Sequence, residues 1–389
     1  MAPKIGSGKN NYGGTEAFIN NFCIAYHRYH SITVLGTDDI ECDLENVTVI
    51  RSGNYSRAYL EEQSGTKARC NNGGIVAKIN QVINLGDYDI VIDNTTNKVV
   101  CQSLSKDKLK NNSLRTRIFS IAHSRPSYAG RGVDETVKWM SELTNTIDFI
   151  SVTKESVDEW NKLSNKVVGR PVFKGYTGLR VLDKNVGHAE FSYSYDYYSN
   201  QHFVIVGRID PVKNFGQFNQ FAVKNPRFNF SAWALLIPCG QKCYDELHID
   251  KLTGPESNLK YYLNKSINEK ELFIRTNNAI TCSTSISENG GTTCIESMMW
   301  GLPIVVVNHR ENGCRKYVLD GEVKFKNEQF TITSHGILLE NLGGLTAANL
   351  SIAYDKAREL EAFDRKAIRE YFKENLCFNE NFISQLYGI

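Results

Sequence analysis

Short apolar runs alternate with amphipathic stretches along the chain, which is the pattern of domains that alternate strands and helices. The first half predicts strands at residues 31–35, 47–50, 88–93, 117–122 and 149–152. Helices are predicted at residues 15–27, 74–85, 134–143 and 156–163. Strands this apolar, bounded by polar turns, suit a parallel sheet that is covered on both faces.

A second series of the same kind begins near residue 201. Its predicted strands are residues 203–206, 232–238, 272–275, 279–283 and 304–308, and a charged helix is predicted at 351–373. We therefore expect an α/β fold of two Rossmann-like domains with a cleft between them. The predicted divisions are an N-terminal domain (1–172), a connection (173–200), a C-terminal domain (201–350) and a C-terminal helix packing back toward the first domain (351–389).

Composition narrows the class of protein. The 389 residues suffice for two domains, and 41% hydrophobic residues allow each a core. A net charge of +2 argues against a surface that is basic all over. No apolar run reaches the roughly 20 residues that cross a bilayer, and no signal-peptide pattern opens the chain. Ten cysteines without metal-type spacing indicate reduced thiols and a cytoplasmic protein.

The stretch ISENGGTTCIESMMWGLP, residues 286–303, carries the strongest chemical signal. It reads as a loop that leads into a helix near Thr292. Free N–H groups at a helix start bind phosphate, and Gly290 and Gly291 allow close approach of the backbone. Glu288 is placed to bind sugar hydroxyls, and Glu296 to hold the two hydroxyls of a ribose. Two solvated glutamates beside a capped helix are the alternative.

A second signal is GRIDPVKNF, residues 207–215, which follows a predicted strand. Arg208 and Lys213 stand five positions apart across a turn, where both can reach one diphosphate. Fixed cations there stabilise the negative charge that develops on a leaving nucleoside diphosphate. A surface turn with two exposed cations is the alternative.

Two further segments are weaker. GSGKNNYGGTEAF, residues 6–18, lacks the P-loop spacing, but Gly13 and Gly14 can close on a diphosphate before a helix starts. A mobile N-terminal loop is the alternative. Only residues 1–5 precede this loop, so we expect either a very short first strand or a chain that starts late. In IAHSRPSY, His123 follows a strand directly and can bind a sugar or acceptor hydroxyl; a structural histidine is equally expected.

Together these motifs resemble the retaining glycosyltransferases of the GT-B fold, family 4 type. The resemblance implies transfer of a sugar from a nucleoside diphosphate, most often UDP, with retained anomeric configuration and no metal at the site. It implies that Glu288 faces the sugar and Glu296 the ribose. It places the diphosphate against Arg208 and Lys213.

A narrower resemblance concerns the acceptor. The stretches HSRPSYAGRGVDETV and NLCFNENF are similar to the DNA α-glucosyltransferase of T-even bacteriophages, which implies 5-hydroxymethylcytosine in double-stranded DNA as acceptor and, for a phage protein, the host cytoplasm. Basic residues at 106–117 form a candidate DNA footprint, and a solvated lysine-rich loop is the equally expected alternative. Acceptor-binding candidates are Arg125, Tyr128 and Arg131.

Other functions stay open on the sequence. The acceptor can instead be a surface polysaccharide, a lipid-linked glycan or a small molecule. A nucleotide-sugar epimerase shares the two-domain plan, and a non-catalytic nucleotide-binding module would keep part of the motif set.

Overall fold

A computed structural model describes residues 4–5, 14–36, 41–51, 87–94, 115–123, 125–126, 132–178, 180–183, 198, 201–236, 240–378 and 382–388. The chain divides into two compact units. The first holds the described residues of Met1–Ser7 and Thr15–Leu179 and the end of the chain from Phe378. The second holds Gly14 and the described residues of Arg180–Cys377. No helix within the described ranges is long and apolar enough to cross a membrane.

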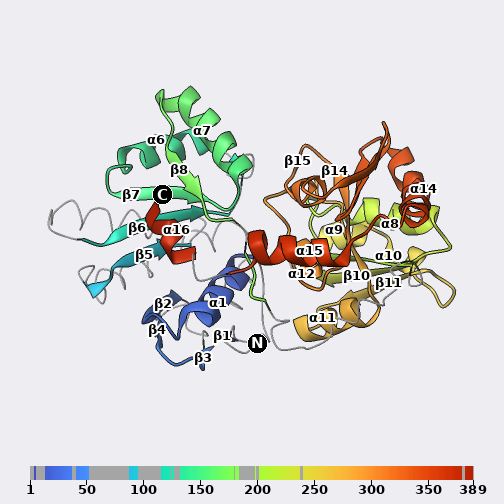
Figure 1. Cartoon of the computed structure of the whole chain (residues 1–389), viewed down its shortest axis with the longest axis horizontal. Helices are drawn as coiled ribbons and strands as arrows, with labels where there is room; N and C mark the ends of the chain where they lie inside the picture. The colour runs from blue at the N-terminus through green and yellow to red at the C-terminus, as the bar shows by residue number, and fades with distance from the viewer. Residues whose placement is uncertain are drawn as a thin grey trace. The chain divides into compact units, whose positions relative to one another are not determined.

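The first unit is built on parallel strands. These are β1 (Lys4–Ile5), β2 (Ile32–Gly36), β3 (Glu41–Cys42), β4 (Val47–Arg51), β5 (Ile90–Asp93), β6 (Arg117–Ala122), β7 (Ile147–Ser151) and β8 (Phe173–Tyr176). Strands β5-β6-β7-β8 form one sheet in that order, and β2–β4 and β1–β3 pair separately. The helices are α1 (Gly14–Tyr26), α6 (Val133–Glu142), α7 (Lys154–Val168) and α16 (Phe382–Gly388) (Figure 1).

Successive residues of β6 enter different cores. Ile118 packs in a cluster with Val137 of α6 and Trp160 of α7. Phe119 packs in another with Phe18 of α1 and Phe382 of α16. Since side chains alternate across a strand, these helices cover opposite faces of the sheet. The prediction of a parallel sheet covered on both faces is confirmed here.

The second unit contains one sheet of eight strands. Its strands, in chain order, are β9 (His202–Arg208), β10 (Asn229–Leu235), β11 (Leu259–Leu263), β12 (Ile280–Ser283), β14 (Ile304–Asn308), β16 (Val323–Lys326), β17 (Phe330–Thr333) and β18 (Gly336–Glu340). The order in space is β11-β10-β9-β12-β14-β18-β17-β16, parallel from β11 to β18 and antiparallel beyond. The chain winds one way from β9 through β11 and then reverses to β12, so the topological switch point lies between β9 and β12.

Helices and short strands connect the strands of this sheet or follow its last strand. They are α8 (Phe215–Lys224), α9 (Gln241–Glu246), α10 (Ile249–Leu252), α11 (Ile267–Thr276), β13 (Ser287–Glu288), α12 (Thr292–Met299), β15 (Glu311–Asn312), α13 (Arg315–Leu319), α14 (Gly344–Glu359), α15 (Arg365–Tyr371) and the π-helix η4 (Phe372–Leu376). Helix α14 packs against α8 (Figure 1).

One predicted strand is wrong. Residues 272–275 lie in α11, because Ser266 and Glu269 form a capping box that starts a helix just before this apolar run. The strand at that place in the sheet is β11, which the sequence pattern missed. The predicted helix at 351–373 is two helices, α14 and α15, with a break between them, and the predicted helix at 74–85 lies outside the described residues.

The unit boundaries differ in detail from the predicted domains. Strand β8 pairs with β7 in the first unit, although it falls in the stretch predicted as a connection. Of the C-terminal segment, α14 and α15 belong to the second unit and α16 to the first. The predicted domain boundaries stay a proposal.

Candidate active site

The candidate active site lies at the switch point of the second sheet. Strand β9 ends at Arg208 and its neighbour β12 at Ser283, so the loops that follow both strands leave from the same edge. Ligands of open parallel sheets collect at this edge. The two loops touch: the Thr284 hydroxyl donates to the carbonyl of Lys213 (2.9 Å), and the Ile286 N–H to that of Val212 (2.8 Å).

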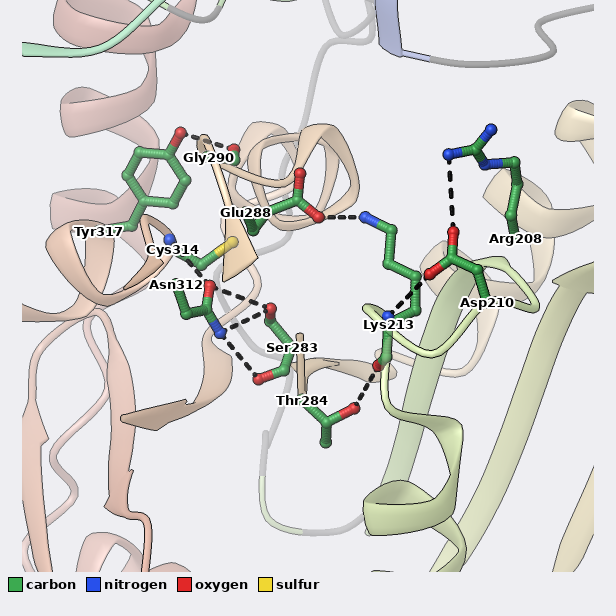
Figure 2. A network of polar contacts seen from close by, with 10 residues as sticks. All are labelled: Arg208, Asp210, Lys213, Ser283, Thr284, Glu288, Gly290, Asn312, Cys314 and Tyr317. Atoms are coloured by element: carbon green, nitrogen blue, oxygen red, sulfur yellow. Dashed lines mark hydrogen bonds and ion pairs between the residues drawn. The ribbon is translucent and has the colours of Figure 1, made fainter. Parts of the chain in front are cut away.

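The turn after β9 carries two cations around one carboxylate (Figure 2). The Asp210 carboxylate accepts the Lys213 backbone N–H at 3.0 Å, and its other oxygen lies 3.6 Å from the Arg208 guanidinium. The side chain of Arg208 is 54% exposed. Asn214 takes a left-handed conformation (φ 52°) where α8 begins, which closes the turn. The turn therefore presents Arg208 toward solvent and holds Lys213 closer in.

Lys213 forms an ion pair with Glu288, and Figure 2 shows the ammonium directed at the carboxylate. Both side chains are mostly buried, 24% and 20% exposed. Burial alone would lower the pKa of the Lys213 ammonium, but the carboxylates of Glu288 and Asp210 outweigh burial and raise it. Lys213 is therefore charged throughout the neutral range. The two sequence motifs meet in this pair.

The glycine loop beside Glu288 is held in place by contacts with β15 and the residues that follow it. β13 pairs with β15, and the Gly313 N–H donates to the carbonyl of Glu288 at 2.7 Å. The buried Tyr317 hydroxyl donates to the carbonyl of Gly290, also at 2.7 Å. A Cβ on Gly291, whose φ is +25°, would come within 2.6 Å of the Cys314 sulfur. Glycine is required at Gly291 for space and backbone conformation alike.

Helix α12 starts at Thr292, directly after this loop, as the sequence predicts. Its N-cap is Gly291, which has no side chain to bond the first N–H groups. An uncapped helix start carries a partial positive charge and free donors, which suits an anion.

Glu296 lies one turn further along α12 and pairs with Lys270 of α11, not with Arg208 or Lys213. The Lys270 Nζ to Glu296 Oε2 distance is 2.7 Å, and the side chains are 10% and 16% exposed. Thus Asp210 contacts Arg208 and Lys213, and Lys213 also pairs with Glu288. Glu296 instead pairs with a cation from a different helix, Lys270 of α11.

In the first unit, His123 follows β6 and hydrogen-bonds the side chain of Asn94, with Phe18 packed edge-on against its ring. Arg125 is 4% exposed and pairs with Glu159 of α7 at 2.5 Å, so its charge holds a helix in place. Gly14 begins α1. Gly13, Tyr128 and Arg131 lie outside the described residues. The roles of these residues stay predictions.

Sequence reasoning missed Asp210, Lys270 and Tyr317. Asp210 sits inside the RIDPVK turn, so its position was a usable signal. Lys270 and Tyr317 are 26 and 27 residues from the atoms they bond, and no local pattern marks them. Within the described residues, no cluster of three or more metal-binding side chains occurs.

Comparisons with known proteins concern the family and the fold. Residues 199–334, which include both motifs, match the model of a family described as glycosyl transferases, group 1. No curated protein matches the chain.

Several solved structures are similar over most of the chain. HepE of Anabaena, in complex with UDP and glucose, is 16% identical over 99% of this chain and 98% of its own, with a TM-score of 0.63. The lipopolysaccharide outer core galactosyltransferase WaaB is 15% identical over 99% and 97%, with a TM-score of 0.57. TarM of S. aureus, in complex with UDP, is 14% identical over 81% and 58%, with a TM-score of 0.54. At these identities the likeness establishes the fold, not the substrates.

Proposed function

Because the protein is a glycosyltransferase with the GT-B fold, whose second unit carries the group 1 domain, we propose that it transfers a sugar from UDP to a carbohydrate hydroxyl with retention of configuration. The predicted fold class and enzyme class are confirmed. The donor nucleotide, the stereochemistry and the acceptor are the proposal.

The observation that carries the proposal is the Lys213–Glu288 pair at the switch point, inside the matched segment. A lysine ammonium has three donors, so Lys213 can keep Glu288 and still bind a diphosphate. Glu288 then lies beside the diphosphate, where the sugar must begin. Arg208, exposed at the mouth of the turn, adds a forked donor to the same diphosphate.

The chemistry follows from this placement. As the bond between the anomeric carbon and the diphosphate breaks, negative charge grows on the leaving oxygen, and Arg208 and Lys213 stabilise it. The acceptor hydroxyl attacks the same face of the sugar, and its proton passes to the leaving phosphate. Glu288 orients the sugar by accepting hydrogen bonds from its hydroxyls.

UDP as carrier is supported by the solved structures: HepE was solved with UDP-glucose and with UDP, and TarM with UDP. A carbohydrate acceptor is supported by WaaB, which is described as acting on the lipopolysaccharide outer core. These statements concern those proteins, and their use here is part of the proposal.

DNA is the second candidate acceptor, on the strength of the stretch at 123–137. Two of its predicted phosphate contacts are already engaged in the structure. Arg117 pairs with Asp148 at 2.8 Å, and Arg125 is buried against Glu159. Lysines 106, 108 and 110 lie outside the described residues. Arg115, the other described cation of the candidate footprint, is exposed. The choice of a carbohydrate acceptor therefore rests on the similar structures and not on these cations.

An acceptor panel separates these functions. The protein is incubated with labelled UDP-sugars and, in parallel, lipid-linked oligosaccharides, polysaccharide fragments, hydroxymethylated DNA and unmodified DNA. We expect label in a carbohydrate product with unchanged anomeric configuration by NMR, at the same rate with and without EDTA. Label only in hydroxymethylated DNA would replace the carbohydrate with DNA. An altered UDP-sugar without any acceptor would indicate an epimerase.

A further inference from the structure

Lys270 has no role in the motifs described above, but it forms a mostly buried pair with Glu296, which does. Lys270 comes from α11 and Glu296 from α12, and the two charged groups meet at 2.7 Å with little exposure to solvent. Taking two charges out of water costs more than a surface pair returns, so such pairs are weak devices for stability alone. A mostly buried pair one helical turn from the donor loop suggests a functional reason.

The two oxygens of the Glu296 carboxylate have different surroundings. Its Oε2 is held by Lys270, and within the described residues Oε1 has no hydrogen-bond partner. A glutamate has three rotatable torsions, and a fixed cation on one oxygen restricts them. The second oxygen is then held ready for a hydroxyl, without ordering the side chain at the moment of binding.

The positive charge of Lys270 also offsets the negative charge of Glu296. Each acid at the site has a cation nearby. The pairs are Asp210 with Arg208, Glu288 with Lys213, and Glu296 with Lys270. A bare Glu296 carboxylate would repel an incoming diphosphate across a mostly buried site, where such repulsion is strong. Lys270 neutralises that carboxylate and leaves its acceptor oxygen in place.

We infer that Lys270 is a positioning residue: it fixes Glu296 so that the free oxygen accepts a ribose hydroxyl of the donor. The site thereby selects ribonucleoside over 2′-deoxyribonucleoside diphosphates. This inference rests on the proposed function, since it requires a nucleoside diphosphate at the switch point, and on the ribose role that the motif resemblance implies for Glu296.

The test compares UDP with 2′-deoxy-UDP by calorimetry in the wild-type protein and in Lys270→Met. We expect the wild type to prefer UDP by about tenfold or more, as one charge-assisted hydrogen bond allows. Lys270→Met should weaken UDP binding by about tenfold and bring the two ligands close to equal affinity. In turnover assays the donor KM should rise while kcat changes little.

Three further variants make the result specific. Lys270→Arg keeps the cation and should restore the preference for UDP. Lys265→Met removes an exposed lysine from the turn before α11 and should change nothing. Lys270→Met combined with Glu296→Gln leaves no unpaired charge, so it remains informative if the single variant fails to fold. It should discriminate no better than Glu296→Gln alone.

The outcomes are distinguishable. If Lys270→Met folds and keeps the wild-type preference for UDP, Lys270 does not position Glu296. If the wild type binds UDP and 2′-deoxy-UDP equally, the inference fails while the proposed function stands. If the wild type binds no UDP, the proposed donor fails, and the inference fails with it.

Discussion

At the scale of single residues, the site is defined by the ion pairs between its acidic and basic side chains. Lys213 has its pKa raised by Glu288 and Asp210 in spite of burial, so it is a fixed cation at neutral pH. Arg208 is far more exposed and has only a 3.6 Å contact with Asp210, so it can turn to a ligand with little loss. The two cations are therefore unequal: Lys213 anchors the loop, and Arg208 is the cation that we propose closes on the donor.

Replacing Glu288 by alanine should collapse turnover and leave nucleotide affinity largely intact. Glu288 is proposed to contact the sugar, whereas Arg208, Lys213 and the start of α12 are proposed to hold the nucleotide. We expect kcat to fall by about 10²-fold or more, with the UDP dissociation constant within a few fold of wild type. The measurements are steady-state transfer and UDP calorimetry.

Glu328→Ala is the matched control, because Glu328 is exposed in the turn between β16 and β17. It should transfer at the wild-type rate. Near-wild-type transfer by Glu288→Ala would remove Glu288 from the site.

At the scale of elements, the active-site loop is shaped by its support. Residues 288–291 have hydrogen bonds to Gly313 and Tyr317, and Asn312 donates to the Ser283 hydroxyl at 3.1 Å at the end of β12. A loop anchored at several backbone atoms does not need to order itself when the donor binds. Preorganisation of this kind lowers the cost of stabilising the transition state.

Gly291→Ala should therefore damage activity as well as stability. The new methyl group would meet the Cys314 sulfur at 2.6 Å, and the positive φ adds strain. Relief requires the loop to move, which displaces Glu288 and the first turn of α12. We expect kcat/KM to fall by about tenfold or more, since displacements near 1 Å can cost that much.

Gly343→Ala isolates the backbone effect. Gly343 also has a positive φ of 64°, but a Cβ there meets nothing within 4 Å. It should lower the thermal midpoint slightly and leave kcat/KM unchanged. Equal activity losses in both variants would show that the contact with Cys314 is not what matters.

At the scale of the whole molecule, stability depends on groups far from the chemistry. His202, at the start of β9, hydrogen-bonds Ser231 at 2.8 Å and packs edge-on against Phe273. Burial lowers the pKa of this imidazole to about 4, with a smaller effect of Lys260. The folded chain thus keeps His202 neutral down to a pH at which the unfolded chain already binds a proton.

The sign of the pH dependence follows by linkage. An unfolded histidine protonates below about pH 6.5, so the free energy of unfolding should fall as the pH drops from about 6.5 to about 4. Above pH 6.5 this group contributes no slope. His202→Gln should remove the part of this loss that is due to His202. We expect that part to lower the thermal midpoint by about 3 °C or more between pH 7 and pH 4.5.

The measurement is thermal unfolding of both proteins across that range. If the two midpoints fall in parallel between pH 7 and pH 4.5, His202 is not the group responsible.

Several elements were predictable because their signal is local. Strands β6, β9, β12 and β14 are short apolar runs with polar turns at both ends, and the covered parallel sheet follows from them. The prediction of secondary structure failed where a local pattern is compatible with both a strand and another structure. The apolar run at 272–275 reads as a strand until the capping box before it is weighed, and β11, with two tyrosines and a lysine, does not read as a core strand.

The sequence by itself determined the chemistry available to this protein: a glycine turn between two glutamates, and an arginine and a lysine after a strand. Only the tertiary structure decided the partners. Lys213 and Glu288 are 75 residues apart, and they meet because β9 and β12 are neighbours in the sheet. Lys270 finds Glu296 because α11 and α12 bring them together. The glycine turn and the charged residues can be read from the local sequence. Which charged residues form ion pairs depends on the order of strands in the sheet, which no short stretch of sequence encodes.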